Sequence, residues 1–191
     1  GIFVSCGGSD NDTTPVAPPA PAAPEPVAAS FECPSVTNSA GTAVVQGTDA
    51  AGGDTCTYTG TYTDSFTMAS EATHVLSGPV NIGDDTATPT LTVEAGTTIR
   101  GESGPDSLNI LRGAKIIAAG TAAAPIIMTS TSDDGTLAAD AQGQWGGLQI
   151  MGRATLNCTD AEKNSAGVCE RAAEGYSSGI TVPYGGTNDL D

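Results

Sequence analysis

The chain has 191 residues and a net charge of −16, because only six Lys and Arg stand against 22 Asp and Glu. A protein that binds duplex nucleic acid needs a basic surface, so we expect no nucleic-acid partner. No run of about eighteen apolar residues occurs, and the sequence therefore predicts no membrane-spanning helix. Aromatic residues make up only 4% of the chain, which favours thin strands packed by Ile, Leu and Val.

The N-terminal residues have the composition of a cleaved export signal. Residues 1–5 are largely apolar, like the end of the apolar region of a signal peptide. The order Phe3-Val4-Ser5-Cys6 resembles a bacterial lipobox, with Phe3 in place of the usual Leu. This resemblance implies that residues 1–5 are a signal-peptide remnant and that Cys6 carries a lipid anchor to a membrane. The alternative is a free cysteine in a frayed terminus.

A proline-rich stretch follows the cysteine. Proline at this density prevents a helix or a central strand and favours an extended chain of about 3.1 Å per residue. We therefore expect residues 6–30 to form a disordered Pro/Ala-rich tether of at most about 75 Å. A lipid at Cys6 with such a tether would hold the protein off a membrane surface, so we expect it in the bacterial cell envelope, at the outer membrane or cell surface, with secretion as the alternative. The prolines are Pro15, Pro18, Pro19, Pro21, Pro24 and Pro26.

Residues 31–72 read as a small β cap. Small polar and aromatic residues alternate from residue 57 to residue 63, which is the period of a half-buried strand. We expect the large side chains of this segment to cover the open lower end of the fold, with carbohydrate stacking by the tyrosines as an alternative. These side chains are Tyr58, Tyr62, Phe66 and Met68.

Short apolar runs separated by Gly, Pro, Asp and Ser dominate the centre of the chain. Four runs begin at Leu91, Leu108, Ile126 and Leu148, at separations of 17, 18 and 22 residues. Strand-turn units repeated near every twenty residues predict a solenoid, in which stacked coils bury apolar faces that are too small to be buried alone. A β-sandwich is the alternative, although no Asn-Gly or Asp-Gly hairpin joins neighbouring runs.

The same residues resemble bacterial secreted or surface proteins with a right-handed parallel β-helix of the pectin-lyase-like kind. The resemblance covers residues 60–154 and the tail from Gly179, and it implies all-β coils over residues 73–191. We expect further coils beyond residue 191. Such helices carry lyases, hydrolases, adhesins and lipoproteins of no assigned function, so the resemblance leaves the activity open. The matching stretches are VLSGPV, LTVEAGTTIRG, LNILRGAKIIAAGTAAAPIIMTS and WGGLQIMGRA.

Four cysteines remain when Cys6 is set aside, and they fall into two local pairs. We expect disulfides between Cys33 and Cys56 and between Cys158 and Cys169, although four cysteines allow three pairings. Disulfides indicate an oxidising compartment. A four-thiolate zinc site is disfavoured, because zinc sites use closely spaced cysteines.

Two apparent catalytic motifs have simpler interpretations. Residues 175–179 (GYSSG) match the nucleophile elbow of α/β-hydrolases. The elbow needs a preceding strand, a following helix and a later histidine. The single histidine, His74, lies upstream, so we interpret the match as chance and expect His74 at a surface or corner position.

The charged residues leave calcium binding and catalysis open. Carboxylates cluster in expected turns at Asp84, Asp85, Asp133, Asp134, Asp140, Asp189 and Asp191. Calcium takes such oxygens, so calcium is a possible cofactor. Four basic residues stand beside expected strands. They either line one face of the fold or are exposed to solvent and offset by Glu94 and Glu102. These residues are Arg100, Arg112, Lys115 and Arg153.

A polar insertion at residues 157–178 interrupts the repeat. Excursions from a solenoid commonly carry recognition, so we expect a non-catalytic surface lipoprotein whose β-helix presents a binding site for a ligand, a glycan or a surface protein partner. The alternative is a polysaccharide lyase or glycoside hydrolase whose catalytic coils lie beyond residue 191. The expected ligand-binding residues are Asp160, Lys163, Glu170, Arg171 and, by sugar stacking, Trp145, for which packing at a corner is the simpler role.

Overall fold

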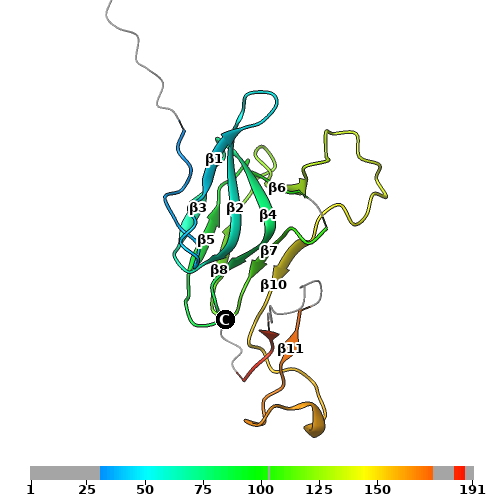
Figure 1. Cartoon of the computed structure of the whole chain (residues 1–191). Coiled ribbons are helices and arrows are strands. Elements are labelled where there is room, and N and C mark those ends of the chain that lie inside the picture. The colour runs from blue at the N-terminus through cyan, green and yellow to red at the C-terminus, as the bar shows by residue number, and fades with distance from the viewer. Residues whose placement is uncertain (1–30, 103, 174–182, 188–191) are drawn as a thin grey trace, which may run out of the picture. The chain divides into compact units, whose positions relative to one another are not determined.

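The computed structural model describes residues 31–102, 104–173 and 183–187, and its regular elements are almost all β-strands (Figure 1). Our predictions for residues 1–5, Cys6, the tether and the motif at 175–179 lie outside these residues. No helix in the described part is long and apolar enough to cross a membrane. The elements are β1 (Val45–Thr48), β2 (Asp54–Tyr62), β3 (Phe66–Met68), β4 (Thr73–Ile82), β5 (Thr90–Val93), β6 (Thr98–Gly101), β7 (Ser107–Ile110), β8 (Lys115–Ala118), β9 (Ile127–Ser130), β10 (Gly147–Ile150), η1 (Asp160–Glu162), β11 (Arg171–Ala172) and β12 (Pro183–Tyr184).

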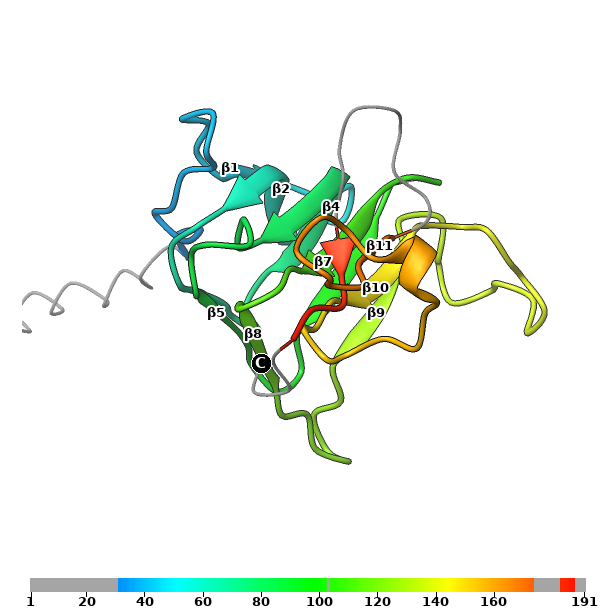
Figure 2. The ribbon, with the colours of Figure 1, turned by 90° about the horizontal axis from the view of Figure 1, so that it is seen from below.

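Strands from successive parts of the chain pair in parallel, in three stacks. The first stack runs through β2, the first half of β4, β6 and β9. The second runs through the ends of β2 and β4, then β7 and β10, and the third through β3, β5 and β8. The view from below separates β5 and β8 from β4, β7 and β10 (Figure 2). Face-to-face sandwiches are built from antiparallel sheets, so this pairing contradicts the β-sandwich alternative.

The chain passes through the first, second and third stacks in turn, and one such round is called a coil. The fourth coil has described strands in the first two stacks only. The first coil holds β2 and β3, the second β4 and β5, the third β6 to β8, and the fourth β9 and β10. Leu91 pairs with Ile116, 25 residues later, and Val80 pairs with Leu108, 28 residues later. The repeat near twenty residues is therefore wrong as a coil length. The four runs lie in different stacks: Leu91 is in the third, Leu108 and Leu148 are in the second, and Ile126 comes just before β9 of the first. Their spacing looked regular because all three stacks use similar short apolar runs.

Alternate side chains of β5 and β6 point inward, and they join the buried side chains of β2, β3, β4 and β7 in one continuous core. Ladders of matching positions such as His74, Ile99 and Met128 in the first stack keep this alternation from coil to coil. The resulting column removes apolar surface from water at about 25 cal/mol per Å². Its fully buried side chains of greatest volume include Tyr58, Tyr62, Met68, Leu76, Ile82, Leu91, Ile99, Leu108 and Ile110.

The aromatic residues of the first coil lie inside this core. Tyr58 and Tyr62 are both 0% exposed, and Phe66 stacks on Tyr58 with ring centroids 5.6 Å apart. These side chains cannot stack on a carbohydrate, so that alternative is wrong. They fill the coil rather than covering it, because β2 and β3 pair in parallel with the second coil.

The cover at this end comes from the residues before β2. Strand β1 adds to β2 as an antiparallel edge strand, and Phe31, Cys33, Val36 and Val44 pack against the core. A disulfide between Cys33 and Cys56, with an S–S distance of 2.02 Å, ties the cover to β2. The Gln46 amide donates to the Phe31 carbonyl oxygen at 2.8 Å. One end of the stack is thus sealed by the chain itself.

The predicted surface or corner position of His74 is wrong, because the side chain is buried. Its exposed fraction is 0%, and its Nε2 lies 2.8 Å from the Ala69 carbonyl oxygen. A carbonyl only accepts hydrogen bonds, so Nε2 carries the proton and Nδ1 accepts from the Tyr58 hydroxyl at 2.8 Å. Burial lowers the pKa of His74, which keeps the ring neutral. The imidazole is a satisfied polar group of the core.

Candidate functional site

Two long excursions leave the fourth coil, one on each side of β10. The first excursion spans residues 131–146, between β9 and β10. The second comprises the described residues 152–173 and 183–186, which follow β10. Both extend away from the stacked strands in Figure 1, the first in yellow-green and the second in orange. Connections in compact domains are mostly two to six residues long, and longer ones commonly bind partners. These excursions are therefore the candidate site.

The first excursion is held at its start by Asp133. The Arg100 guanidinium of β6 donates to the Asp133 carbonyl oxygen at 2.8 Å, and the Thr129 hydroxyl donates to its carboxylate at 2.7 Å. The same carboxylate accepts from the Gly135 backbone at 2.9 Å. The Thr129 and Gly135 hydrogen bonds lower the pKa of Asp133, so it remains ionised at neutral pH. The loop thus leaves the sheet in a defined direction.

Trp145 holds the other end of the first excursion. It is partly buried and packs against the core cluster. The contact needs glycine beneath it, because a Cβ on Gly101 would stand 2.7 Å from the Cβ of Trp145. The expected packing role of Trp145 agrees with this geometry. The single tryptophan therefore fixes the end of this excursion against the core.

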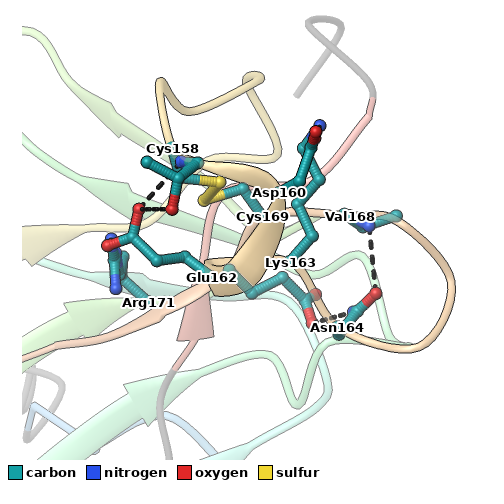
Figure 3. Close-up of a disulfide and its surroundings, with 10 residues drawn as sticks. Cys158, Asp160, Glu162, Lys163, Asn164, Val168, Cys169 and Arg171 are labelled. Carbon is teal, nitrogen blue, oxygen red and sulfur yellow. Dashed lines mark hydrogen bonds and ion pairs between the residues drawn. A yellow bond between two sulfur atoms is a disulfide. The ribbon is translucent and has the colours of Figure 1, made fainter.

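The second excursion is organised by its own disulfide, between Cys158 and Cys169 (Figure 3). Both predicted disulfides are thus present, and the zinc alternative is wrong. Within the closed loop, the backbone and hydroxyl of Thr159 both donate to Glu162 at 2.8 Å, which caps η1. Val168 and Ala166 each donate a backbone hydrogen bond to the Asn164 side chain at 3.0 Å. Local bonds therefore shape this short segment.

A buried arginine fastens the second excursion to the stack. Arg112, just after β7, is 7% exposed and makes charge-assisted hydrogen bonds to Asp85 and Glu170. It also donates to the Gly185 carbonyl oxygen at 2.8 Å. Arg153 adds a second cation to Asp85 at 3.0 Å. The alternative of a solvent-facing Arg112 offset by Glu94 and Glu102 is wrong, because residues far along the chain bury and pair it.

Ion pairing in this cluster shifts the pKa values of Arg112 and Glu170. The Asp85 and Glu170 carboxylates raise the pKa of Arg112, and Arg112 in turn lowers the pKa of Glu170. Asp85 has a φ of 74°, a left-handed conformation that is uncommon outside glycine. The turn after β4 thus presents the Asp85 carboxylate to both arginines.

The expected ligand-binding residues separate into structural pairs. Lys163 pairs with Asp160 at 2.6 Å and Arg171 pairs with Glu162, both within the second excursion. Glu170 is engaged by Arg112, and Trp145 belongs to the first excursion. Sequence reasoning did not single out the first excursion as a candidate site, although its length was a usable signal. It also missed Asp85 and Arg112 as anchors, for which no local pattern exists.

The described acids show the pattern of turn formation. Thr86 and Ala87 backbone groups and the Thr86 hydroxyl bind Asp84, and Thr136 binds Asp134 in the same way. These hydrogen bonds lower the pKa of both carboxyls. Within residues 31–102, 104–173 and 183–187, no group of three or more His, Cys, Asp and Glu is placed to hold a metal ion. Calcium binding stays a prediction.

Parallel stacks of strands that the chain visits in turn are typical of the β-helix class of protein. The chain belongs to the pectate-lyase-like beta helix domain family, whose model matches residues 60–191. No curated protein and no solved structure matches the chain.

Proposed function

We propose that this protein is a non-catalytic, lipid-anchored surface protein, in which a right-handed β-helix presents the two excursions to a glycan. The right-handed sense is supported by the parallel pairing of successive strands, since parallel crossover connections are right-handed in about 98% of cases. The observation that carries the proposal is the placement of both excursions on one coil, on either side of β10. A rigid scaffold with anchored loops is the common construction of a binding site.

The roles of the ionisable groups support binding over catalysis. A general acid at neutral pH needs a raised carboxyl pKa. Asp84, Asp133, Asp134, Glu162 and Glu170 all have lowered pKa values, each from hydrogen bonds that shape a turn or an anchor. Polysaccharide lyase or hydrolase activity is the second candidate, favoured by the family description and by Arg100 on the outer face of the first stack.

The proposal of a membrane anchor rests on the sequence alone. Cys6 would carry the lipid, and residues 6–30 would separate the membrane from the folded body. Two disulfides among the described residues suit an oxidising compartment, which is what an exported protein meets. Mass spectrometry of the N-terminal peptide tests this part: a mature terminus at Cys6 with added acyl mass supports it, and an unmodified Cys6 in protein isolated from membranes contradicts it.

Affinity electrophoresis through gels that contain neutral and acidic polysaccharides tests the binding function. We expect retardation in at least one gel, and loss of retardation when residues 134–142 are replaced by a short Gly-Ser linker. Val45→Lys is the matched control, because Val45 is exposed at the sealed end. Incubation of the protein with the same polysaccharides should release no unsaturated products and no new reducing ends. Product formation would establish the enzyme instead, and the absence of any retardation would contradict glycan binding.

A further inference from the structure

The outer face of the first stack carries a small polar hollow of about 220 Å³. Its floor comes from β2, β4 and β6, which pair in that order and belong to three successive coils. One wall is the turn between β1 and β2, and the other is the start of the first excursion. The hollow therefore borders the candidate site. Its lining residues are Asp49, Thr55, Thr73, Val75, Arg100 and Thr131.

Strand alternation turns the floor residues away from the core. Cys56 and His74 are fully buried, so their neighbours along the strands point to the outer face. Thr55 pairs with Thr73, which sets two side-chain hydroxyls about 4.8 Å apart, the spacing of neighbouring strands. Val75 adds apolar surface beside them. The floor thus combines hydroxyl groups, which both donate and accept hydrogen bonds, with one apolar side chain.

Arg100 brings hydrogen-bond donors to this floor. Its one side-chain hydrogen bond among the described residues runs from Nη1 to the Asp133 carbonyl oxygen, at 2.8 Å. A guanidinium has five N–H donors, and the buried Nε of Arg100 has no partner within the described part of the chain. Unpaired donors in a partly buried position cost free energy. The arginine therefore favours an acceptor oxygen in the hollow.

The charges of the lining balance, with Arg100 as its one cation and Asp49 as its one anion. Asp49 Oδ1 accepts from the backbone N–H groups of Ala51 and Gly53 at 2.9 and 2.8 Å, which holds the carboxylate in place. An acidic ligand would be repelled by Asp49 and by a chain of net charge −16, and a basic ligand would be repelled by Arg100. The hollow therefore suits an uncharged ligand with several hydroxyl groups.

We propose that this hollow binds one ring of a sugar, and that the glycan of the proposed function is uncharged. Sites for drug-sized ligands measure about 300 to 1,000 Å³, so this smaller hollow takes a single ring. Thr55 and Thr73 exchange hydrogen bonds with the sugar hydroxyls, Arg100 donates to a sugar oxygen, and Val75 packs against the apolar face of the ring. The inference rests on the proposed function and names its class of ligand.

Affinity electrophoresis of the whole chain tests the inference, in gels that contain neutral β-glucan, neutral galactomannan or acidic polygalacturonate. We expect retardation in a neutral gel and none in polygalacturonate. Replacing Thr55 and Thr73 together by Val removes both hydroxyls and keeps the branched shape that suits a strand. This change should lower the association constant at least about tenfold. Thr92→Val is the matched control, because Thr92 points outward from β5 in the third stack, and it should leave binding unchanged.

The outcomes separate this inference from the proposed function. Retardation by polygalacturonate alone would overturn the uncharged ligand but keep glycan binding. Retardation in a neutral gel that survives loss of both hydroxyls, or that falls equally with Thr92→Val, would overturn the role of the hollow. No retardation in any gel would overturn glycan binding and this inference with it. Circular dichroism checks the fold of each variant, and if the double variant fails to fold, Thr73→Val alone should weaken binding about fivefold.

Discussion

The two ends of the stack are built from the same parallel coils but differ in what covers them. At one end β1 and the segment 31–44 lie over the first coil, and a disulfide fixes them. At the other end the described residues leave β8, β9 and β10 without a further strand. The comparison shows that burial in such a fold belongs to the place in the stack rather than to the residue type.

The largest expected contrast is between two isoleucines at one ladder position. Ile110→Ala should cost about 3 kcal/mol of unfolding free energy, because it leaves a cavity in a closed core. Ile150→Ala should cost less than about 1 kcal/mol, because its side chain is largely in water already. Urea unfolding of both variants measures the difference. Equal losses would mean that the fourth coil is covered.

The two disulfides sharpen the comparison between the cover and the second excursion. Cys33 and Cys56 are 23 residues apart, and replacing both by Ser should lower global stability by about 3 kcal/mol. Replacing Cys158 and Cys169 should leave the global unfolding midpoint nearly unchanged and increase proteolysis within residues 152–173, since that loop lies outside the core. A similar drop in midpoint for both double variants would contradict this division.

The arginine anchor predicts a local effect with a defined pH dependence. Arg112→Met should weaken docking of the second excursion by about 2 kcal/mol, because it leaves Asp85 and Glu170 without their main cation. Arg112 lowers the pKa of Glu170, so in the wild type this contribution is present above the unfolded-state value near 4.5 and is lost as pH falls through the folded value.

Limited proteolysis of the second excursion between pH 7 and pH 3 measures this contribution. Lys163→Met is the control, because Lys163 pairs only within the excursion. Arg112→Met that digests like the wild type at pH 7 would show that the anchor does not hold the loop.

The smallest expected effect concerns His74 in the sealed half of the core. Its folded pKa is lowered by burial, so the unfolded chain binds a proton first as pH falls below about 6.5. Stability should therefore decline from pH 7 towards pH 5, by at most about 1.4 kcal/mol per pH unit. His74→Gln should flatten this slope. A slope that survives the substitution would assign the titration to another group.

The sequence was sufficient for the class of fold and for the covalent links. Short apolar runs without hairpin turns indicated parallel coils, and the positions of the four cysteines indicated both disulfides. These features are local, so each can be recognised within a few dozen residues. The β-helix resemblance agrees with the matched family.

The coil length and the arginine anchor could not be predicted from local sequence features. Leu91 and Leu108 look like successive repeats, yet they lie in different stacks, because inward rows of all stacks have similar composition. Arg112 and Glu170 are 58 residues apart, and no sequence pattern predicts that contact. His74 looked exposed because its partners, Tyr58 and the Ala69 carbonyl group, come together only across coils and turns.

Amide hydrogen exchange, resolved strand by strand, tests most directly that β1 and the segment before it close their end of the stack. We predict slow exchange in β2 and β4, intermediate exchange in β7 and the fastest exchange among stacked strands in β8, β9 and β10. Exchange in β2 as fast as in β10 would contradict the account, because the cover would then not close the stack.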